Sequence, residues 1–177
     1  KGEDTGNPVS FHIDAAQARV EMLPAFSYVR GVYDLNLQLD VGRTGGQRGK
    51  VRATSVLHPG DYLYIDYDIP RRRPLEVLVD AEEAKGGALA GALGLPSDQA
   101  FTFKAVVGGK VSEGQFGVVA GSGPAEPLRA LGGWSKDGGV ARGRVSLTAS
   151  SLTAPYARRF GPLASFVVAG RRAGADL

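Results

Sequence analysis

The chain has 177 residues, of which 21 are basic, 18 are acidic, two are histidine and none is cysteine. The lack of cysteine excludes disulfides, thiolate metal sites and cysteine nucleophiles. The net charge of +3 is far below that of the concentrated basic face of a nucleic-acid binder, so we expect no nucleic-acid partner. No segment reaches the roughly 18 consecutive apolar residues of a membrane-spanning helix, and the chain begins at Lys1. We therefore expect one segment, residues 1–177, of a larger protein whose membrane anchor lies outside this chain.

The first half of the chain shows the alternation of apolar and polar residues that predicts β-strands. The clearest example is VYDLNLQLDV, residues 32–41, in which Leu35, Leu37 and Leu39 alternate with polar residues. Such strict alternation indicates one buried face and one hydrated face. Residues 1–8 are polar, and we expect them to be flexible. Further strands are predicted over residues 9–13, 19–22, 50–57, 61–69 and 75–81.

A helical period replaces the strand period over residues 82–93, where small apolar residues recur at helical spacing. Glu82 and Glu83 fall in the first turn of this predicted helix, where the helix dipole favours acidic side chains. Three glycines make it a weak helix that needs a surface to pack on, and Pro96 is expected to end it.

The second half returns to strands, with a turn-rich stretch around Trp134 and a second short helix over residues 153–160. The short connections between regularly spaced strands favour an antiparallel meander. No composition change marks a domain boundary. The strands of this half are predicted over residues 101–107, 115–120, 140–150 and 163–170.

No motif in the chain carries a complete catalytic or metal-binding set. The stretch GVVAGSGPAEPLRAL, residues 117–131, resembles a dinucleotide-binding turn, but Glu126 occupies the third glycine position, so we expect a loop between strands. His12 and His58 are isolated from each other and lack metal-ligand spacing. We therefore expect no enzymatic activity, no catalytic residue, no metal and no cofactor.

Arg71, Arg72 and Arg73 form the strongest local charge in the chain and lie between two prolines. One interpretation is a site for phosphate headgroups or an acidic partner. The favoured interpretation is a hydrated turn that also discourages strand pairing at a sheet edge.

The apolar face that recurs on almost every predicted strand also has two interpretations. It can be the closed core of a β-sandwich or barrel, or the lining of an open lipid groove. Composition alone favours the closed core.

A family resemblance favours the second interpretation. The stretch LAGALGLPSDQAFTFKAVVGG, followed by GQFGVVAGSG, resembles a segment typical of the TamB family, in which an apolar helix ending in Leu-Gly-Leu-Pro precedes a strand. ARGRVSLTAS and LTAPYARRFGPLASFVVAGR resemble the family's following strand and recurring short helix. The upstream YDLNLQLDVGRTGGQRGKVRATSV is similar to its strand–turn–strand unit, although the turn lacks the usual proline. The related AsmA-like proteins share this architecture.

The resemblance implies a mostly β fold, a curled antiparallel half-pipe with an apolar inner face and one or two short helices. It also implies the periplasmic part of an inner-membrane-anchored protein in a bacterium with two membranes. The implied function is to shield phospholipid acyl chains in transit and to support outer-membrane assembly. An alternative is a scaffold or chaperone-like module that binds an outer-membrane barrel protein resembling TamA, or an unfolded outer-membrane protein.

On this interpretation the groove is lined at alternate strand positions, and Leu89 and Leu93 of the predicted helix cover part of it. Gly86, Gly87 and Gly91 would permit the close approach. The groove-lining residues are then expected to be Leu35, Leu37, Leu39, Leu63, Ile65, Val77, Val79, Phe101, Phe103, Phe116, Val118, Val145 and Leu147.

Overall fold

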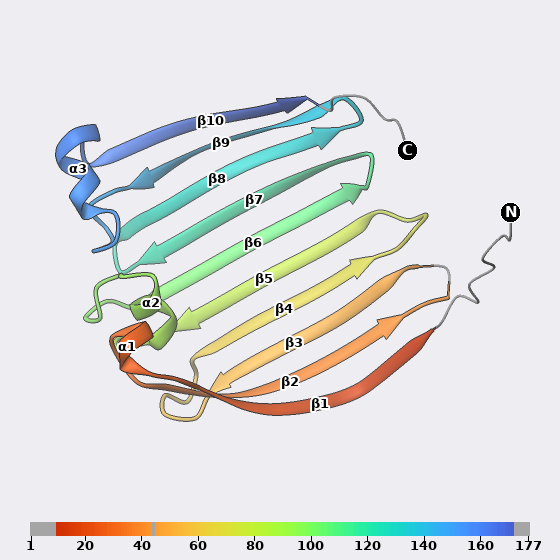
Figure 1. Ribbon diagram of the computed structural model, residues 1–177, viewed down its shortest axis with the longest axis horizontal. Coiled ribbons are helices and arrows are strands. Elements are labelled where there is room, and N and C mark those ends of the chain that lie inside the picture. Colours follow the sequence, from red (N-terminus) through yellow and green to blue (C-terminus); the bar gives the residue numbers. More distant parts are fainter. Residues whose placement is uncertain (1–9, 44, 172–177) are drawn as a thin grey trace, which may run out of the picture.

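The computed structural model describes residues 10–43 and 45–171, and these form one ten-stranded antiparallel sheet with three short helices. The strands follow one another in chain order, so each strand pairs only with its neighbours in sequence (Figure 1). β1 and β10 do not pair with each other, and the sheet is therefore open. The expected mostly β fold, an open and curled antiparallel sheet, is confirmed. The segment 1–8, expected to be flexible, lies outside the described residues.

The strands are joined alternately at two ends of the sheet. Four tight connections lie at one end, called here the turn end, and the three helices lie at the other, the helix end (Figure 1). The strands are β1 (Phe11–Met22), β2 (Gly31–Val41), β3 (Gln47–Ser55), β4 (Tyr62–Ile69), β5 (Leu75–Glu83), β6 (Phe101–Lys110), β7 (Glu113–Ser122), β8 (Ala125–Ser135), β9 (Gly138–Ser146) and β10 (Leu163–Arg171). The helices are α1 (Pro24–Ser27), α2 (Ala88–Ala92) and α3 (Ala154–Phe160).

The structure corrects two strand predictions. The two short strands predicted near the N-terminus are one strand, β1, with a register irregularity between Ile13 and Ala16. The stretch predicted as turn-rich is the strand β8. Its glycines misled the prediction, because they serve packing here: a Cβ at Gly132 would lie 2.7 Å from the ring of Phe116.

The helix predictions are right in kind but not in extent. α3 starts one residue later than predicted, and α1 was not predicted at all. α2 spans only five residues, and Glu82 and Glu83 belong to β5, so neither carboxylate lies in the first helical turn.

The strand register places the main apolar series of each strand on one face, while isolated apolar residues such as Leu78 and Val106 lie on the other. For example, Leu37 lies opposite Val51, and Val51 lies opposite Ile65. Directly opposite residues of paired strands share a face. By this register, the twelve expected lining residues that lie in strands occupy the same face. Leu147 follows the end of β9 and is buried.

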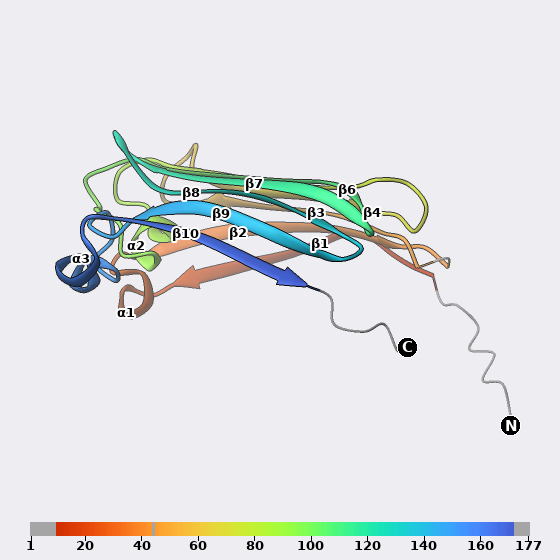
Figure 2. The same ribbon diagram turned by 90° about the horizontal axis from the view of Figure 1, so that it is seen from above.

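This apolar face is concave. Figure 2 shows β1 and β10 bending away from the central strands, toward the side on which the helices lie. α2 packs on the apolar face, against Phe101 and Tyr33 among others. The opposite, convex face carries ion pairs between neighbouring strands, such as Arg19 with Asp34 at 2.7 Å and Lys50 with Asp66 at 3.4 Å.

The buried core is confined to the helix end of the concave face. One cluster contains Ala90, Leu95, Phe101 and Ala120, and the second contains Tyr33, Ala53 and Ala88. Both clusters lie where α2 covers the sheet. Elsewhere on the concave face the described side chains are only partly buried, because no second layer covers them.

Candidate binding surface

The uncovered part of the concave face is the main candidate site, and we call it the apolar floor. Its side chains come from β2 to β7, and strand alternation turns them all to the same side. Their exposure is intermediate, which reflects burial by neighbours within the sheet alone. The apolar floor contains Leu35, Leu37, Leu39, Val51, Ile65, Val77, Val79, Val107, Phe116 and Val118.

At the helix end, α2 closes the apolar floor. Ala88 and Ala90 are 2% and 1% exposed, and Leu89 packs against both core clusters. Leu93 is 49% exposed and belongs to neither cluster. The contact expected from Leu89 and Leu93 is therefore made by Leu89 together with the two alanines, while Leu93 lies outside it.

A buried carboxylate attaches α2 to the sheet. Glu83 ends β5 with no exposed surface. Its oxygens accept hydrogen bonds from the backbone N–H groups of Leu89 and Ala90, at 3.0 Å and 2.8 Å, and from the hydroxyl of Tyr33 at 2.5 Å. The first N–H groups of a helix have no partner within the helix, so Glu83 caps α2 from a neighbouring strand. A carboxylate was expected at the start of this helix, and one lies there. Glu83 reaches that position from β5 rather than from the first helical turn.

Burial raises the pKa of Tyr33 well above its ordinary range, and the hydrogen bond to Glu83 raises it further. A charged phenolate would be poorly solvated here and would lie beside a carboxylate. Tyr33 therefore acts as a neutral donor to Glu83.

The C-terminus of α2 shows why its glycines are needed. Gly94 has a positive φ of 66°, and the N–H groups of Gly94 and Leu95 donate to the carbonyls of Gly91 and Ala90. This is the Schellman arrangement that ends many helices, so the helix ends before Pro96. A Cβ at Gly91 would lie 1.9 Å from the carbonyl oxygen of Ser27, so this glycine allows α2 to approach α1, whereas the approach expected from the sequence was to the groove.

The arginine cluster lies in the β4–β5 connection, at the turn end of the sheet. Arg71, Arg72 and Arg73 are exposed, and Arg73 pairs with Asp68 at 3.3 Å. The hydrated-turn interpretation agrees with this exposure. However, β4 and β5 are central strands, so the interpretation that the cluster protects a sheet edge is wrong.

The remaining sequence motifs do not form sites in the described part of the chain. Residues 117–131 form β7, a tight turn and β8, with no helix to receive a dinucleotide. The ring of His12 lies 2.8 Å from Asp14 at an exposed position. Across residues 10–43 and 45–171, no group of three or more metal-ligating side chains gathers. The described helices also include none that is long and apolar enough to span a membrane.

Sequence reasoning missed Glu83 as a structural residue, although the alternation of β5 contained the signal. Leu75, Val77, Val79 and Ala81 occupy one face, and Glu83 continues the same series. A carboxylate in an apolar series needs partners. The prediction of a helix from residue 82 interrupted the series and hid this.

Comparison with protein-family models, with curated proteins and with solved structures finds no match to this chain. The resemblance to the TamB family therefore stays a prediction from the quoted sequence stretches.

Proposed function

We propose that this chain is a segment of a periplasmic, inter-membrane groove protein that shields the acyl chains of phospholipids on their way to the outer membrane. The observation that carries the proposal is the apolar floor: a continuous, concave apolar surface that no described residue covers. An apolar surface of this extent on a protein in water is typical of a binding surface. The proposal includes no chemical step, so it assigns no catalytic residue.

The dimensions of the sheet suit a lipid chain. Ten strands at about 4.8 Å spacing span roughly 45 Å, and strands of about ten residues are roughly 33 Å long. Each CH₂ group that leaves water contributes about 0.8 kcal/mol. About ten buried CH₂ groups would therefore contribute about 8 kcal/mol before the costs of association. Such binding requires apolar area rather than a specific polar contact.

The family resemblance supports the cellular setting of the proposal. The resemblance to TamB-like proteins implies an inner-membrane anchor outside this segment and a partner barrel protein in the outer membrane. On this proposal, several such segments join edge to edge into one longer groove. The open edges of β1 and β10 are compatible with that continuation.

The test replaces one residue of the apolar floor. Leu37 is partly exposed and faces the concave side, so the carboxylate of Leu37→Asp can reach water and the sheet should survive. The same carboxylate would repel an acyl chain. The matched control is Asn36→Asp, because Asn36 is the adjacent residue on the convex face.

The measurement has two parts. Folding is followed by circular dichroism, and bound phospholipid is measured by organic extraction of the purified protein followed by mass spectrometry. We expect phospholipid in the wild type and in Asn36→Asp and much less in folded Leu37→Asp. Equal lipid in all three proteins, or none in the wild type, would contradict the proposal. An unfolded Leu37→Asp protein would show that the apolar floor is an ordinary core.

A second function is favoured by the two edge strands. β1 and β10 each have only one strand neighbour, and an extended peptide can add to such an edge. This supports a scaffold that holds an outer-membrane barrel protein or its unfolded chain. Capture of an unfolded outer-membrane polypeptide by the lipid-free protein, unaffected by Leu37→Asp, would favour this function over lipid shielding.

A further inference from the structure

The turn end of the concave face contains a row of glycines with one aromatic side chain among them. The register aligns Gly109, Gly114, Trp134, Gly139 and Gly170 across five successive strands. A Cβ at Gly114 would lie 2.2 Å from the ring of Trp134, so the ring lies across this glycine. A cleft of about 960 Å³ lies at this end, and Trp134, Gly139 and Gly170 of this row are among the residues that line it.

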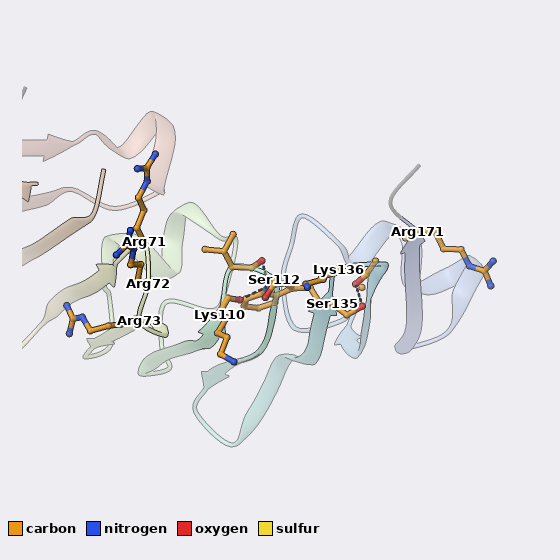
Figure 3. Close-up of a pocket in the computed structure, with 13 residues that line it drawn as sticks. Arg71, Arg72, Arg73, Lys110, Ser112, Ser135, Lys136 and Arg171 are labelled. Carbon is orange, nitrogen blue, oxygen red and sulfur yellow. Dashed lines mark hydrogen bonds between the residues drawn. The ribbon is translucent and has the colours of Figure 1, made fainter. Parts of the chain in front are cut away.

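Basic residues are among those that line this cleft (Figure 3). The β4–β5 arginines and Lys136 lie in turns, whereas Lys110 and Arg171 occupy strand-end positions that alternate with the glycine row. Figure 3 shows the β4–β5 arginines on one side, Arg171 on the opposite side, and Lys110 and Lys136 between them, with Ser112 and Ser135 nearby. We call this site the basic cleft. Its lining includes the cations Arg71, Arg72, Arg73, Lys110, Lys136 and Arg171, together with Trp134 and the glycines Gly138, Gly139 and Gly170.

Most of this positive charge is available to a ligand. Among the described residues, Arg71, Arg72, Lys136 and Arg171 form no ion pair. The other two cations each have one exposed carboxylate partner, Arg73 with Asp68 and Lys110 with Glu113, at 3.3 Å and 3.4 Å. The basic cleft therefore has an excess of cations over anions.

Trp134 gives the basic cleft a fixed floor. Its indole N–H donates to the backbone carbonyls of Lys110 and Val111, at 3.2 Å and 3.1 Å. This contact ties β8 to the β6–β7 turn and fixes the ring at the cleft. An indole suits the boundary between a polar and an apolar part of a ligand.

The row of Trp134, Gly139 and Gly170 in the basic cleft adjoins the apolar floor on the same face. The next row of the sheet contains Val77, Val107, Phe116, Gly132 and Ala141, which the register aligns on the same face. A ligand in the cleft therefore meets cations at one end and apolar side chains at the other. α2 covers the face beside Tyr33 and Phe101 at the helix end, whereas the cations lie at the turn end, which favours the polar end of such a ligand there.

We propose that the basic cleft binds the phosphate-bearing headgroup of a glycerophospholipid whose acyl chains lie on the apolar floor. This inference rests on the proposed function and adds the orientation and the headgroup class of the lipid. Arginine and lysine side chains are the usual partners of phosphate oxygens. The continuity with the apolar floor favours a lipid headgroup over free phosphate.

The experiment uses Trp134, the only tryptophan of the chain, as an intrinsic fluorescent reporter in the cleft. The wild type is titrated with dioctanoyl phosphatidylglycerol, with dioctanoylglycerol, which has the same chains and no phosphate, and with sodium phosphate. We expect phosphatidylglycerol to bind at least tenfold more tightly than dioctanoylglycerol at low ionic strength. Added salt should reduce this preference.

Two triple variants distinguish an effect of the basic cleft from an effect of the net charge of the protein. The first replaces the cleft arginines by glutamine: Arg71→Gln, Arg72→Gln and Arg73→Gln. The control removes three exposed arginines from other positions and leaves the described ion pairs intact: Arg52→Gln, Arg142→Gln and Arg159→Gln. Both variants should unfold at the wild-type urea midpoint, because exposed charges at a turn add little to stability.

The outcomes distinguish the two proposals. We expect the cleft variant to lose the tenfold preference for phosphatidylglycerol and to keep its dioctanoylglycerol binding, while the control variant keeps both. Equal phosphatidylglycerol affinity in wild type and cleft variant would overturn the headgroup site and leave the proposed function standing. Binding of phosphate but of neither lipid would overturn both proposals.

Discussion

At the scale of single residues, the contact between Tyr33 and Glu83 decides how the part of the sheet beneath α2 is built. The two residues come from β2 and β5, 50 positions apart. Together they fill the end of the concave face beneath α2. A five-residue helix is too short to be stable alone, so its position depends on this carboxylate.

Glu83→Gln should destabilise the protein by about 1–3 kcal/mol, which is typical when a buried acceptor is lost. The amide supplies only one acceptor oxygen, and its NH₂ group would face a backbone N–H. The control is Glu82→Gln, since Glu82 is the exposed neighbour in the same strand. Urea unfolding followed by circular dichroism measures both, and equal midpoints for the two variants would contradict this role of Glu83.

Tyr33 makes the stability of the folded protein depend on pH in the alkaline range. Its pKa is raised in the folded protein, above the ordinary value of about 10. A group with a raised pKa adds stability below its unfolded-state pKa, and this contribution is lost as pH rises toward the folded pKa. The free energy of unfolding should therefore fall above about pH 10.

Tyr33→Phe isolates this effect, because the variant has no phenol to ionise at this position. It should be less stable than the wild type at pH 8, yet lose less stability between pH 9 and pH 11. Urea unfolding across this range provides the measurement. A parallel loss of stability in both proteins would assign the alkaline effect to other tyrosines.

For single residues, the sequence predicts which face of the sheet a side chain occupies better than it predicts which side chains it contacts. Strand alternation places Leu35, Leu37 and Leu39 on one face, and the structure places them there. The hydrogen bond between Tyr33 and Glu83 was not predictable, because it depends on how the four strands β2 to β5 bring Tyr33 beneath α2. The glycine row around Trp134 was also hidden, since glycines in sequence indicate turns more often than a flat strand surface.

At the scale of elements, α1 and α2 form one cap because Gly91 lets their backbones meet. The carbonyl of Ser27 occupies the place where a side chain at position 91 would begin. Ser27 is itself fully buried, and its hydroxyl donates to the carbonyl of Val29 at 2.6 Å. The cap therefore has little freedom to adjust.

Gly91→Ala should cost about 1–3 kcal/mol, the usual range when a packed contact is overfilled. The control is Gly117→Ala, because Gly117 has open space where a Cβ would be placed and no positive φ. Thermal unfolding of the two variants tests the difference. A Gly91→Ala protein as stable as Gly117→Ala would show that α1 moves away at little cost.

The predictions of helices and strands succeed where the apolar residues follow a single period along the sequence. β2 to β7 follow alternating patterns, and their existence was predicted for every one. β8 was missed because Pro127, Gly132 and Gly133 interrupt its pattern. α1 was missed because four residues contain too little periodicity to identify a helix, and because tertiary contact with α2 stabilises it.

At the scale of the whole molecule, the open sheet has a covered end, an uncovered middle and a basic end. The sequence predicted the open sheet only through a family resemblance, because alternation describes a closed core equally well. Curvature depends on the twist accumulated over ten strands, and no short stretch of sequence specifies it.

Hydrogen exchange should follow this arrangement. Backbone amides of β5 and β6 near α2 should exchange slowest, and those of β1 and β10 fastest, since each edge strand has one neighbour. Exchange measured by mass spectrometry of peptic fragments gives the profile. Uniform protection across all ten strands would indicate that the edges are covered in solution.

The meander order of the sheet also limits how far a disturbance travels. No connection crosses the sheet, so a defect in β9 reaches β2 only through the six strands between them. Stability in such an array is close to a sum of local terms, as in repeat proteins, rather than a property of one shared core. The two halves of the molecule can therefore loosen separately, and damage to one edge leaves the opposite edge in register.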